Sequence, residues 1–221
     1  MDYLTYKLLS EIEVKTIVTE LRNNDESWED GKKTAGKLAS KLKNNLQLNR
    51  ESPLSINLRE KIESKIVHDP LIKSFAIPKL IHGIMFTQAK EGMYYGNHVD
   101  NPYMTSGRSD LSFTIFLSNK NEYKGGELSI QRLNKSETIK LEAGEILIYP
   151  STSIHSVKKI EKGVRIVCVG WIESYVKCNE IREYLFGLDA GAKGLLSKHG
   201  RSNELDLVFQ SYGNLLRRLG D

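Results

Sequence analysis

The sequence predicts an α+β protein in which a β sandwich or barrel carries helices at both ends of the chain. Apolar residues recur at helical spacing near the two ends, whereas short runs rich in β-branched and aromatic residues fill the stretch from Pro78 to Trp171. Turn signals such as Lys-Gly-Gly, Ala-Gly and Lys-Gly separate these runs. That alternation of short strands and tight turns is typical of sandwiches and barrels.

The first third of the chain is expected to be largely helical. Ser10 followed by Glu13 is a capping box, and the apolar spacing after it predicts a helix over 11–23. A strand is possible around Trp28. A second helical pattern ends near the turn signal at 69–70 and rests on three apolar residues: Leu58, Ile62 and Ile66.

An apolar stripe at helical spacing predicts a further helix at the end of the chain. We expect this stripe to pack within the protein rather than to form a groove for a partner. Its members are Leu205, Val208, Phe209, Tyr212, Leu215, Leu216 and Leu219.

Composition excludes several classes of protein. With 39% apolar and 27% charged residues, the chain has no apolar run long enough for a membrane span, and its start does not resemble a secretory signal, so we expect a cytoplasmic protein. The net charge is +4, and the basic run at 32–45 lacks interleaved aromatic residues. We interpret that run as a solvated face rather than a nucleic-acid site. Cys168 and Cys178 fit no zinc spacing and are expected to be reduced thiols, with Cys168 buried.

His98 and Asp100 stand two residues apart in YYGNHVDN. On an extended segment, residues at this spacing point to the same side, so an imidazole and a carboxylate there can converge. His155, where YPSTSIHSV returns to a strand, is the best candidate for a third ligand. Two imidazoles and one carboxylate leave open positions on a metal, as in non-haem Fe(II) oxygenases, and the helical HExxH of zinc hydrolases is absent. Iron is therefore the expected metal.

Arg165 lies within the apolar run VRIVCVGW, ten residues after His155. A guanidinium in a pocket binds a carboxylate through two parallel hydrogen bonds. The alternative is an arginine on an edge strand that faces solvent. The position after His155 favours the carboxylate receptor.

The ordered set YYGNHVDN, RSDLSFTIFLS, YKGGEL, KLEAGEILIYPSTSIHSV and KGVRIVCVGWIES resembles the iron- and 2-oxoglutarate-dependent dioxygenases of the prolyl-hydroxylase-like superfamily. Within that superfamily the chain is most similar to bacterial PKHD-type hydroxylases, because SWEDGKKTAG, KNNLQL and EIREYLFGLD also match. The resemblance implies a double-stranded β-helix, or jelly roll, with packed N-terminal and C-terminal helices. It divides the chain into an N-terminal helical region with the first strands (1–79), a dioxygenase core (80–174) and a C-terminal helical extension (175–221).

The resemblance also assigns roles to residues. His98, Asp100 and His155 match the family's iron ligands, and Arg165 matches the basic residue that pairs with the far carboxylate of 2-oxoglutarate. Tyr95 matches an aromatic residue near the pocket, which either contacts 2-oxoglutarate or only packs. Gly125-Gly126 matches a tight turn between strands.

One departure concerns a tyrosine that related sequences carry nine or ten residues before the first iron ligand. Gln88 and Ala89 stand at that distance here. The hydrogen bond that this tyrosine would make to cosubstrate or bound water is therefore not expected here, whereas the iron triad and Arg165 are unaffected.

Other polar residues have less specific interpretations. Candidate polar liners of a pocket are Ser112, Thr114 and Ser153, and candidate entrance residues are Tyr94, Tyr103 and Met104. The loops at 22–36 and 101–109 could shape a pocket. The remaining histidines are expected to be caps, packed rings or surface residues: His68, His82 and His199.

Two functions follow from these residues. The first is a hydroxylase that uses Fe(II), 2-oxoglutarate and dioxygen, with ascorbate as a further reductant, to hydroxylate an unactivated C–H bond of a peptide side chain or small molecule. It yields succinate and needs no catalytic group apart from the metal centre. The second is a metal-binding jelly-roll module without turnover, which serves as a sensor or regulatory domain. Arg165 favours the enzyme. The oligomeric state stays open, a homodimer being one form.

Overall fold

Two antiparallel sheets form the body of the protein. The computed structural model describes residues 3–34 and 39–221. Within these, seven strands form a major sheet in the order β1 (Leu4–Lys7), β13 (Glu145–Pro150), β9 (Leu111–Phe116), β16 (Arg165–Ser174), β5 (Pro78–Ala89), β4 (Leu46–Leu48) and β2 (Trp28–Asp30). Five strands form a minor sheet in the order β12 (Ser136–Ile139), β11 (Leu128–Gln131), β14 (His155–Val157), β6 (Tyr94–His98) and β3 (Lys43–Asn44). This is the jelly roll that the sequence predicts.

Two short strand pairs complete the β structure. One pair joins β10 (Tyr123–Gly125) to β15 (Ile160–Gly163), and the other joins β7 (Tyr103–Met104) to β8 (Gly107–Arg108). Non-consecutive strands lie next to one another in both sheets, so residues far apart in sequence meet across them.

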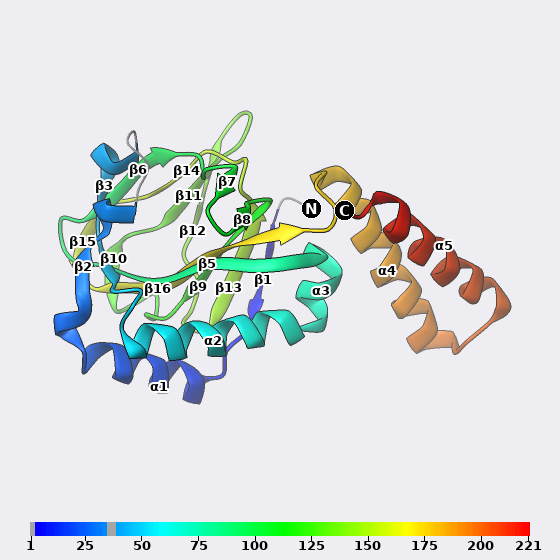
Figure 1. Ribbon diagram of the computed structural model, residues 1–221, viewed down its shortest axis with the longest axis horizontal. Coiled ribbons are helices and arrows are strands. Elements are labelled where there is room, and N and C mark those ends of the chain that lie inside the picture. The colour runs from blue at the N-terminus through cyan, green and yellow to red at the C-terminus, as the bar shows by residue number, and fades with distance from the viewer. Residues whose placement is uncertain (1–2, 35–38) are drawn as a thin grey trace.

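The helices gather at two places (Figure 1). They are α1 (Glu11–Arg22), α2 (Pro53–His68), α3 (Pro70–Ala76), α4 (Asn179–His199) and α5 (Asn203–Leu219), with 3₁₀ turns at Asp25–Ser27, Gly31–Thr34 and Ala39–Leu42. Side by side, α1 and α2 run along the sheets, while α4 and α5 form a hairpin that projects beyond the end of the sheets. In the part of the chain described, none of the helices is sufficiently long and apolar to cross a membrane.

The helix boundaries follow from capping. Ser10 and Glu13 form the expected capping box at the start of α1, so that prediction is confirmed. Asp69 ends α2 as expected, but its carboxylate also accepts hydrogen bonds from the first amides of α3. Pro70 occupies the first turn of α3, where a proline is tolerated because its missing N–H has no partner in a helix. The turn signal therefore also starts a helix that the sequence pattern did not predict.

Strand β9 illustrates how the core is organised. All six of its residues are buried, because the strand is covered on both sides. Phe113 and Ile115 belong to the core cluster that also contains apolar residues of α1 and α2. Ser112 and Thr114 point the other way and line a cavity between the sheets. The major sheet thus separates an apolar layer under the helices from a cavity that both polar and apolar side chains line.

The C-terminal stripe lies on α5, which contacts α4. Leu205 is buried, most of the other members are half-buried, and Leu215 is 39% exposed. The packing that we expected is therefore partial.

The basic run at 32–45 is a mixed case. Lys32, Lys33 and Lys41 are exposed as expected, and 35–38 lie outside the described residues. Lys43 is buried at 7% exposure, so the interpretation as a solvated face is wrong at that position. The reason is that Lys43 belongs to β3, which pairs with β6 at the edge of the minor sheet.

Replacing Ile62 by alanine tests how much the α2 layer contributes to stability. Ile62 is 1% exposed and packs in the main core, so the cavity left behind should lower the free energy of unfolding by about 2–5 kcal/mol. Urea denaturation followed by circular dichroism measures the loss. Ile12→Ala is the control, because Ile12 on α1 is 79% exposed. Equal effects of the two changes would show that α2 does not depend on this contact.

Candidate metal and cosubstrate site

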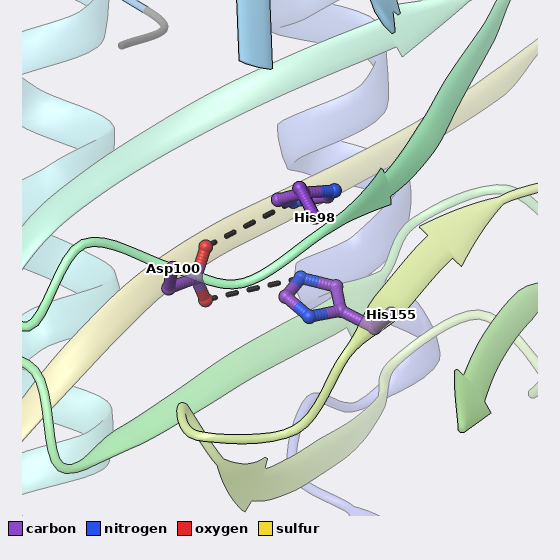
Figure 2. A group of neighbouring side chains, drawn as sticks. All are labelled: His98, Asp100 and His155. Atoms are coloured by element: carbon purple, nitrogen blue, oxygen red, sulfur yellow. Dashed lines mark ion pairs between the residues drawn. The ribbon is translucent and has the colours of Figure 1, made fainter. Parts of the chain in front are cut away.

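Three side chains converge between the sheets (Figure 2). His98 ends β6 and His155 begins β14, and the register of these two strands places the histidines directly opposite each other. Asp100 follows β6 in the loop and lies 3.9 Å from Nε2 of His98 and 3.8 Å from Nε2 of His155, through its two carboxylate oxygens. Each residue offers a ligand atom, and these atoms all lie within 4.8 Å of one another. The donor set is suited to a divalent transition metal with open positions.

Hydrogen bonds orient the two imidazoles alike. Nδ1 of His98 donates to the carbonyl of Gly96 at 2.8 Å, and Nδ1 of His155 donates to the carbonyl of Ser153 at 3.0 Å. A carbonyl can only accept, so the proton stays on Nδ1 of each neutral ring and the lone pair on Nε2 is free for a metal. Ser153 contributes its backbone rather than the polar side chain that the sequence suggested.

Asp100 is held by the hydroxyl of Ser112 on β9, which in turn contacts the hydroxyl of Ser151 just after β13. Ser112 Oγ donates to the Asp100 carboxylate at 2.6 Å, and Ser151 Oγ lies 2.7 Å from Ser112 Oγ. Ser112 is therefore a polar liner with a specific contact. Thr114 lines the same cavity without such a contact among the described hydrogen bonds.

Burial sets the protonation of His98. Desolvation and the neighbouring His155 lower the pKa of His98 to about 4, and the attraction of Asp100 only partly opposes them. The imidazole is therefore neutral near pH 7, which is the form that binds a metal.

Arg165 is buried at the start of β16, with its side chain in the same cavity as the triad. Its guanidinium lies 5.4 Å from the centre of the Phe116 ring, and burial lowers the pKa of Arg165. Nε of Arg165 is buried without a hydrogen-bond partner among the described residues. A buried cation with an unused donor fits a ligand carboxylate, and the alternative of a solvent-facing arginine is wrong.

Tyr123 on β10 is a second buried polar group near Arg165, and the sequence patterns did not single it out. Its hydroxyl is also buried without a partner among the described residues. Burial raises the pKa of Tyr123, and the nearby Arg165 charge acts in the opposite direction. One signal could have found it, since Tyr123 stands directly before the Lys-Gly-Gly turn.

The structure explains the missing tyrosine. Ala89 pairs with Arg165 and lines the cavity, whereas Gln88 pairs with Ile166 and is not among the lining residues. Tyr123 packs in one cluster with Ala89 and Ile160. A small residue at 89 thus leaves room for a tyrosine that comes from another strand.

Gly126 allows this arrangement. Its φ is +69°, and a Cβ there would lie 2.4 Å from Ile160 Cδ1 and 3.1 Å from both Arg165 Cδ and Tyr123 Cε2. Only glycine fits such a turn without displacing these side chains. The tight turn expected at Gly125-Gly126 is confirmed.

Tyr95 packs on the triad. Its ring stacks on that of His98, with centroids 3.7 Å apart and planes 17° apart. Of the two roles expected for Tyr95, packing is the one that the geometry shows, and a contact with 2-oxoglutarate stays a prediction.

The cavity has a volume of about 440 Å³ and joins the triad to Arg165, whereas Tyr123 is not among its lining residues. The triad, Arg165 and the expected entrance residues all line it, and Tyr103 is 74% exposed at its rim. The 101–109 loop contributes several lining residues, whereas the described part of 22–36 contributes none. The remaining histidines lie apart from the triad: His82 is buried and hydrogen-bonded by the 101–109 loop, and His68 and His199 are exposed.

Removing the Ser112 hydroxyl tests its effect on Asp100. We expect Ser112→Ala to weaken Fe(II) binding by roughly 10- to 100-fold, because a ligating carboxylate that has lost its hydrogen bond is less well oriented. Anaerobic metal titration measures the change. Ser129→Ala on β11 is the control, since Ser129 is half-buried and does not line the cavity. Unchanged affinity in Ser112→Ala would mean that Asp100 needs no such support.

The low pKa of His98 predicts a pH-dependent stability. Between its ordinary value of 6.5 and about 4, the unfolded chain binds a proton that folded His98 does not, so the metal-free protein should lose stability as the pH falls through this window. The resulting loss in the free energy of unfolding should be on the order of 1–3 kcal/mol. Urea denaturation with a chelator present, from pH 7 to 4, measures it. His98→Gln should flatten the profile and His68→Gln should not; identical profiles would contradict the assignment.

Comparisons with known proteins agree with this geometry. Residues 84–173 match the family model of the 2OG-Fe(II) oxygenase superfamily. PKHD-type hydroxylases of Prochlorococcus marinus are similar over the whole of both chains, with 66% identity in strain AS9601 and 62% in strain NATL1A.

Solved structures share the fold. A Pseudomonas putida prolyl-4-hydroxylase aligns with a TM-score of 0.58 and 15% identity, covering 78% of this chain and 92% of that one. A Trichoplax adhaerens prolyl hydroxylase, solved with a hypoxia inducible factor peptide, aligns with a TM-score of 0.56 and 16% identity, covering 83% and 86%. With a full-length relative at 66% identity, the chain belongs to the PKHD-type hydroxylases of the 2OG-Fe(II) oxygenase superfamily and is a 2-oxoglutarate-dependent dioxygenase.

Proposed function

We propose that the protein hydroxylates an unactivated C–H bond of a peptide side chain or small molecule while it converts 2-oxoglutarate to succinate and carbon dioxide. The observation that supports this most is one cavity that contains both a metal-type triad and, apart from it, a buried arginine with an unused donor. A module that only binds metal has no need of the second group, which argues against the sensor alternative.

In this proposal His98, Asp100 and His155 hold Fe(II). When bound, the metal supplies the redox chemistry that couples decarboxylation of 2-oxoglutarate by dioxygen to hydroxylation of the substrate. Family membership implies both Fe(II) and 2-oxoglutarate. The protein's own contribution is to fix the ligands: Ser112 orients the carboxylate, and the two backbone carbonyls orient the imidazoles.

Arg165 and Tyr123 would bind the far carboxylate of 2-oxoglutarate. The guanidinium supplies charge and paired donors, and the phenol supplies a further donor. Both are buried, so water competes weakly for the same groups. Apolar side chains such as Met85 and Val169 line the cavity and exclude water from the reacting groups.

Other expectations stay predictions. These are ascorbate as a reductant, a cytoplasmic location, the oligomeric state and the three-part division of the chain.

The proposal is tested by anaerobic addition of Fe(II) and 2-oxoglutarate to the metal-free protein, followed by measurement of succinate after oxygen is admitted. We expect iron to bind, 2-oxoglutarate to change its absorption spectrum, and succinate to form. Iron binding without any response to 2-oxoglutarate would exclude the dioxygenase reaction.

Variants separate the two ends of the cavity. We expect Arg165→Ala to lower the affinity for 2-oxoglutarate by roughly 10- to 100-fold or more, because a charge-assisted hydrogen bond is lost. Iron should still bind. His98→Ala should lose the metal. Tyr123→Phe removes only a hydroxyl and should lower the affinity for 2-oxoglutarate less than Arg165→Ala does. Titration of each anaerobic Fe(II)-loaded variant with 2-oxoglutarate measures its affinity for 2-oxoglutarate.

Tyr103→Phe is the matched control, because Tyr103 is exposed at the rim. Equal loss of iron in Arg165→Ala and His98→Ala would show that Arg165 has a structural role instead.

A further inference from the structure

The segment that contains β3 and β4 forms a polar wall of the cavity. Lys43, Asn45 and Gln47 line the cavity at alternate positions, as expected for an extended chain that turns one face inward. Arg50 follows and also lines the cavity, although it is exposed at its edge. This wall belongs to neither the triad nor the Arg165 end.

Lys43 brings a charge close to the triad. Its Nζ lies 5.2 Å from the centre of the Tyr95 ring, and that ring stacks on His98. The charge of Asp100 acts on Lys43, and the charge of Lys43 acts on His98. Burial lowers the pKa of Lys43 to about 8, so the ammonium is still mainly protonated at pH 7.

Lys43 and Arg165 serve different regions of the cavity. Lys43 lies on the edge strand of the minor sheet, opposite Tyr95. Arg165 lies on the major sheet, opposite Ala89, and its charge acts on Tyr123. A ligand held between the triad and Arg165 therefore does not need Lys43.

Among the described lining residues, positively charged side chains outnumber carboxylates. Lys43, Arg50 and Arg165 are the cations among the described lining residues, and Asp100 is the only carboxylate. The two positive charges of Fe(II) and that of Arg165 balance Asp100 and the two carboxylates of 2-oxoglutarate. Lys43 and Arg50 add two further positive charges to the lining, and the charge of Asp30, which is not a lining residue, acts on Lys43 from outside the cavity. A lining with this excess of cations favours an anionic ligand.

We propose that Lys43 binds a carboxylate of the substrate and thereby places the substrate's C–H bond beside the triad. The inference rests on the proposed function and narrows its substrate to a carboxylic acid. A single ammonium flanked by amides suits a monoanion, whereas a phosphate dianion is usually held by several donors or a nest of backbone amides. Arg50 at the edge attracts the acid towards the cavity.

The experiment compares acids with their amides. N-acetyl amino acids, each as the free acid and as the carboxamide, are titrated by calorimetry under argon into protein loaded with Fe(II) and 2-oxoglutarate. N-acetyl aspartate and glutamate with blocked main-chain carboxylates distinguish a side-chain carboxylate from a main-chain one. We expect at least one acid to bind about tenfold or more tightly than its amide, because a charge-assisted hydrogen bond is gained.

Variants assign this preference to Lys43. Lys43→Gln and Lys43→Met should bring the ratio of amide to acid dissociation constants close to one, and Lys43→Arg should retain most of it. Lys41→Gln is the matched control, because Lys41 is exposed two residues away and does not line the cavity. Thermal melts and the anaerobic spectrum with 2-oxoglutarate show which variants are folded and loaded.

Three results would overturn the inference. The first is a panel in which no acid binds more tightly than its amide. The second is an unchanged ratio in a folded Lys43→Gln. The third is a loss of 2-oxoglutarate affinity in Lys43→Gln as large as the loss for the acid, which would assign Lys43 to the cosubstrate. The titrations need no turnover, so absence of succinate in the wild-type protein would count against the proposed function alone.

Discussion

The direct pairing of His155 with His98 is the constraint on which the rest of the site depends. The two residues come from short neighbouring strands, and the bulge between β14 and β6 falls just beyond this pair. Because side chains alternate along a strand, a slip of one residue would turn one imidazole away from the other. Ser112, which lies on the opposite sheet, must also donate its hydrogen bond to Asp100 to hold the carboxylate beside the two histidines. The triad therefore exists only if both sheets hold their register and their spacing.

Side chains of the major sheet alternate between two faces, so the same strands build both the apolar core and the cavity wall. On β5, β9 and β16, one set of side chains packs under α1 and α2, and the other set faces the cavity. The helix-side residues are large and apolar, such as Phe86 and Phe113, and anchor the strands rigidly. The cavity-side residues are then free to be small or polar, as with Ala89 and Thr114. A rigid outer layer thus supports an interior whose chemistry can vary.

Local patterns in the sequence predicted the parts that depend on local physics. Capping and apolar spacing predicted α1 and α2, and short strands with tight turns predicted a sandwich or barrel. The resemblance of the ordered motifs to a known family then implied the jelly roll and the convergence of His98, Asp100 and His155. Two other residues whose roles come from distant pairing were not placed correctly: the burial of Lys43 was not expected, and Tyr123 was missed. Lys43 lies in a run whose composition is typical of a solvated surface, and it is buried only because β3 pairs with β6. The role of Tyr123 depends on its proximity to Arg165, which lies far along the chain. Single-sequence patterns do not encode such neighbours.

The path of the chain at Asn45 has a practical consequence. The residues before Asn45 add β3 to the minor sheet, and those after it add β4 to the major sheet, so one short segment bridges the two sheets along one side of the cavity. A fragment trimmed to the region from residue 80 onward would contain the residues of the triad, Arg165 and Tyr123, yet it would lack this wall with Lys43 and also the helices α1 and α2 that pack on the major sheet. Crystallography or inhibitor screening aimed at this cavity therefore needs the whole chain, because the segment that closes it lies outside the region that contains the triad.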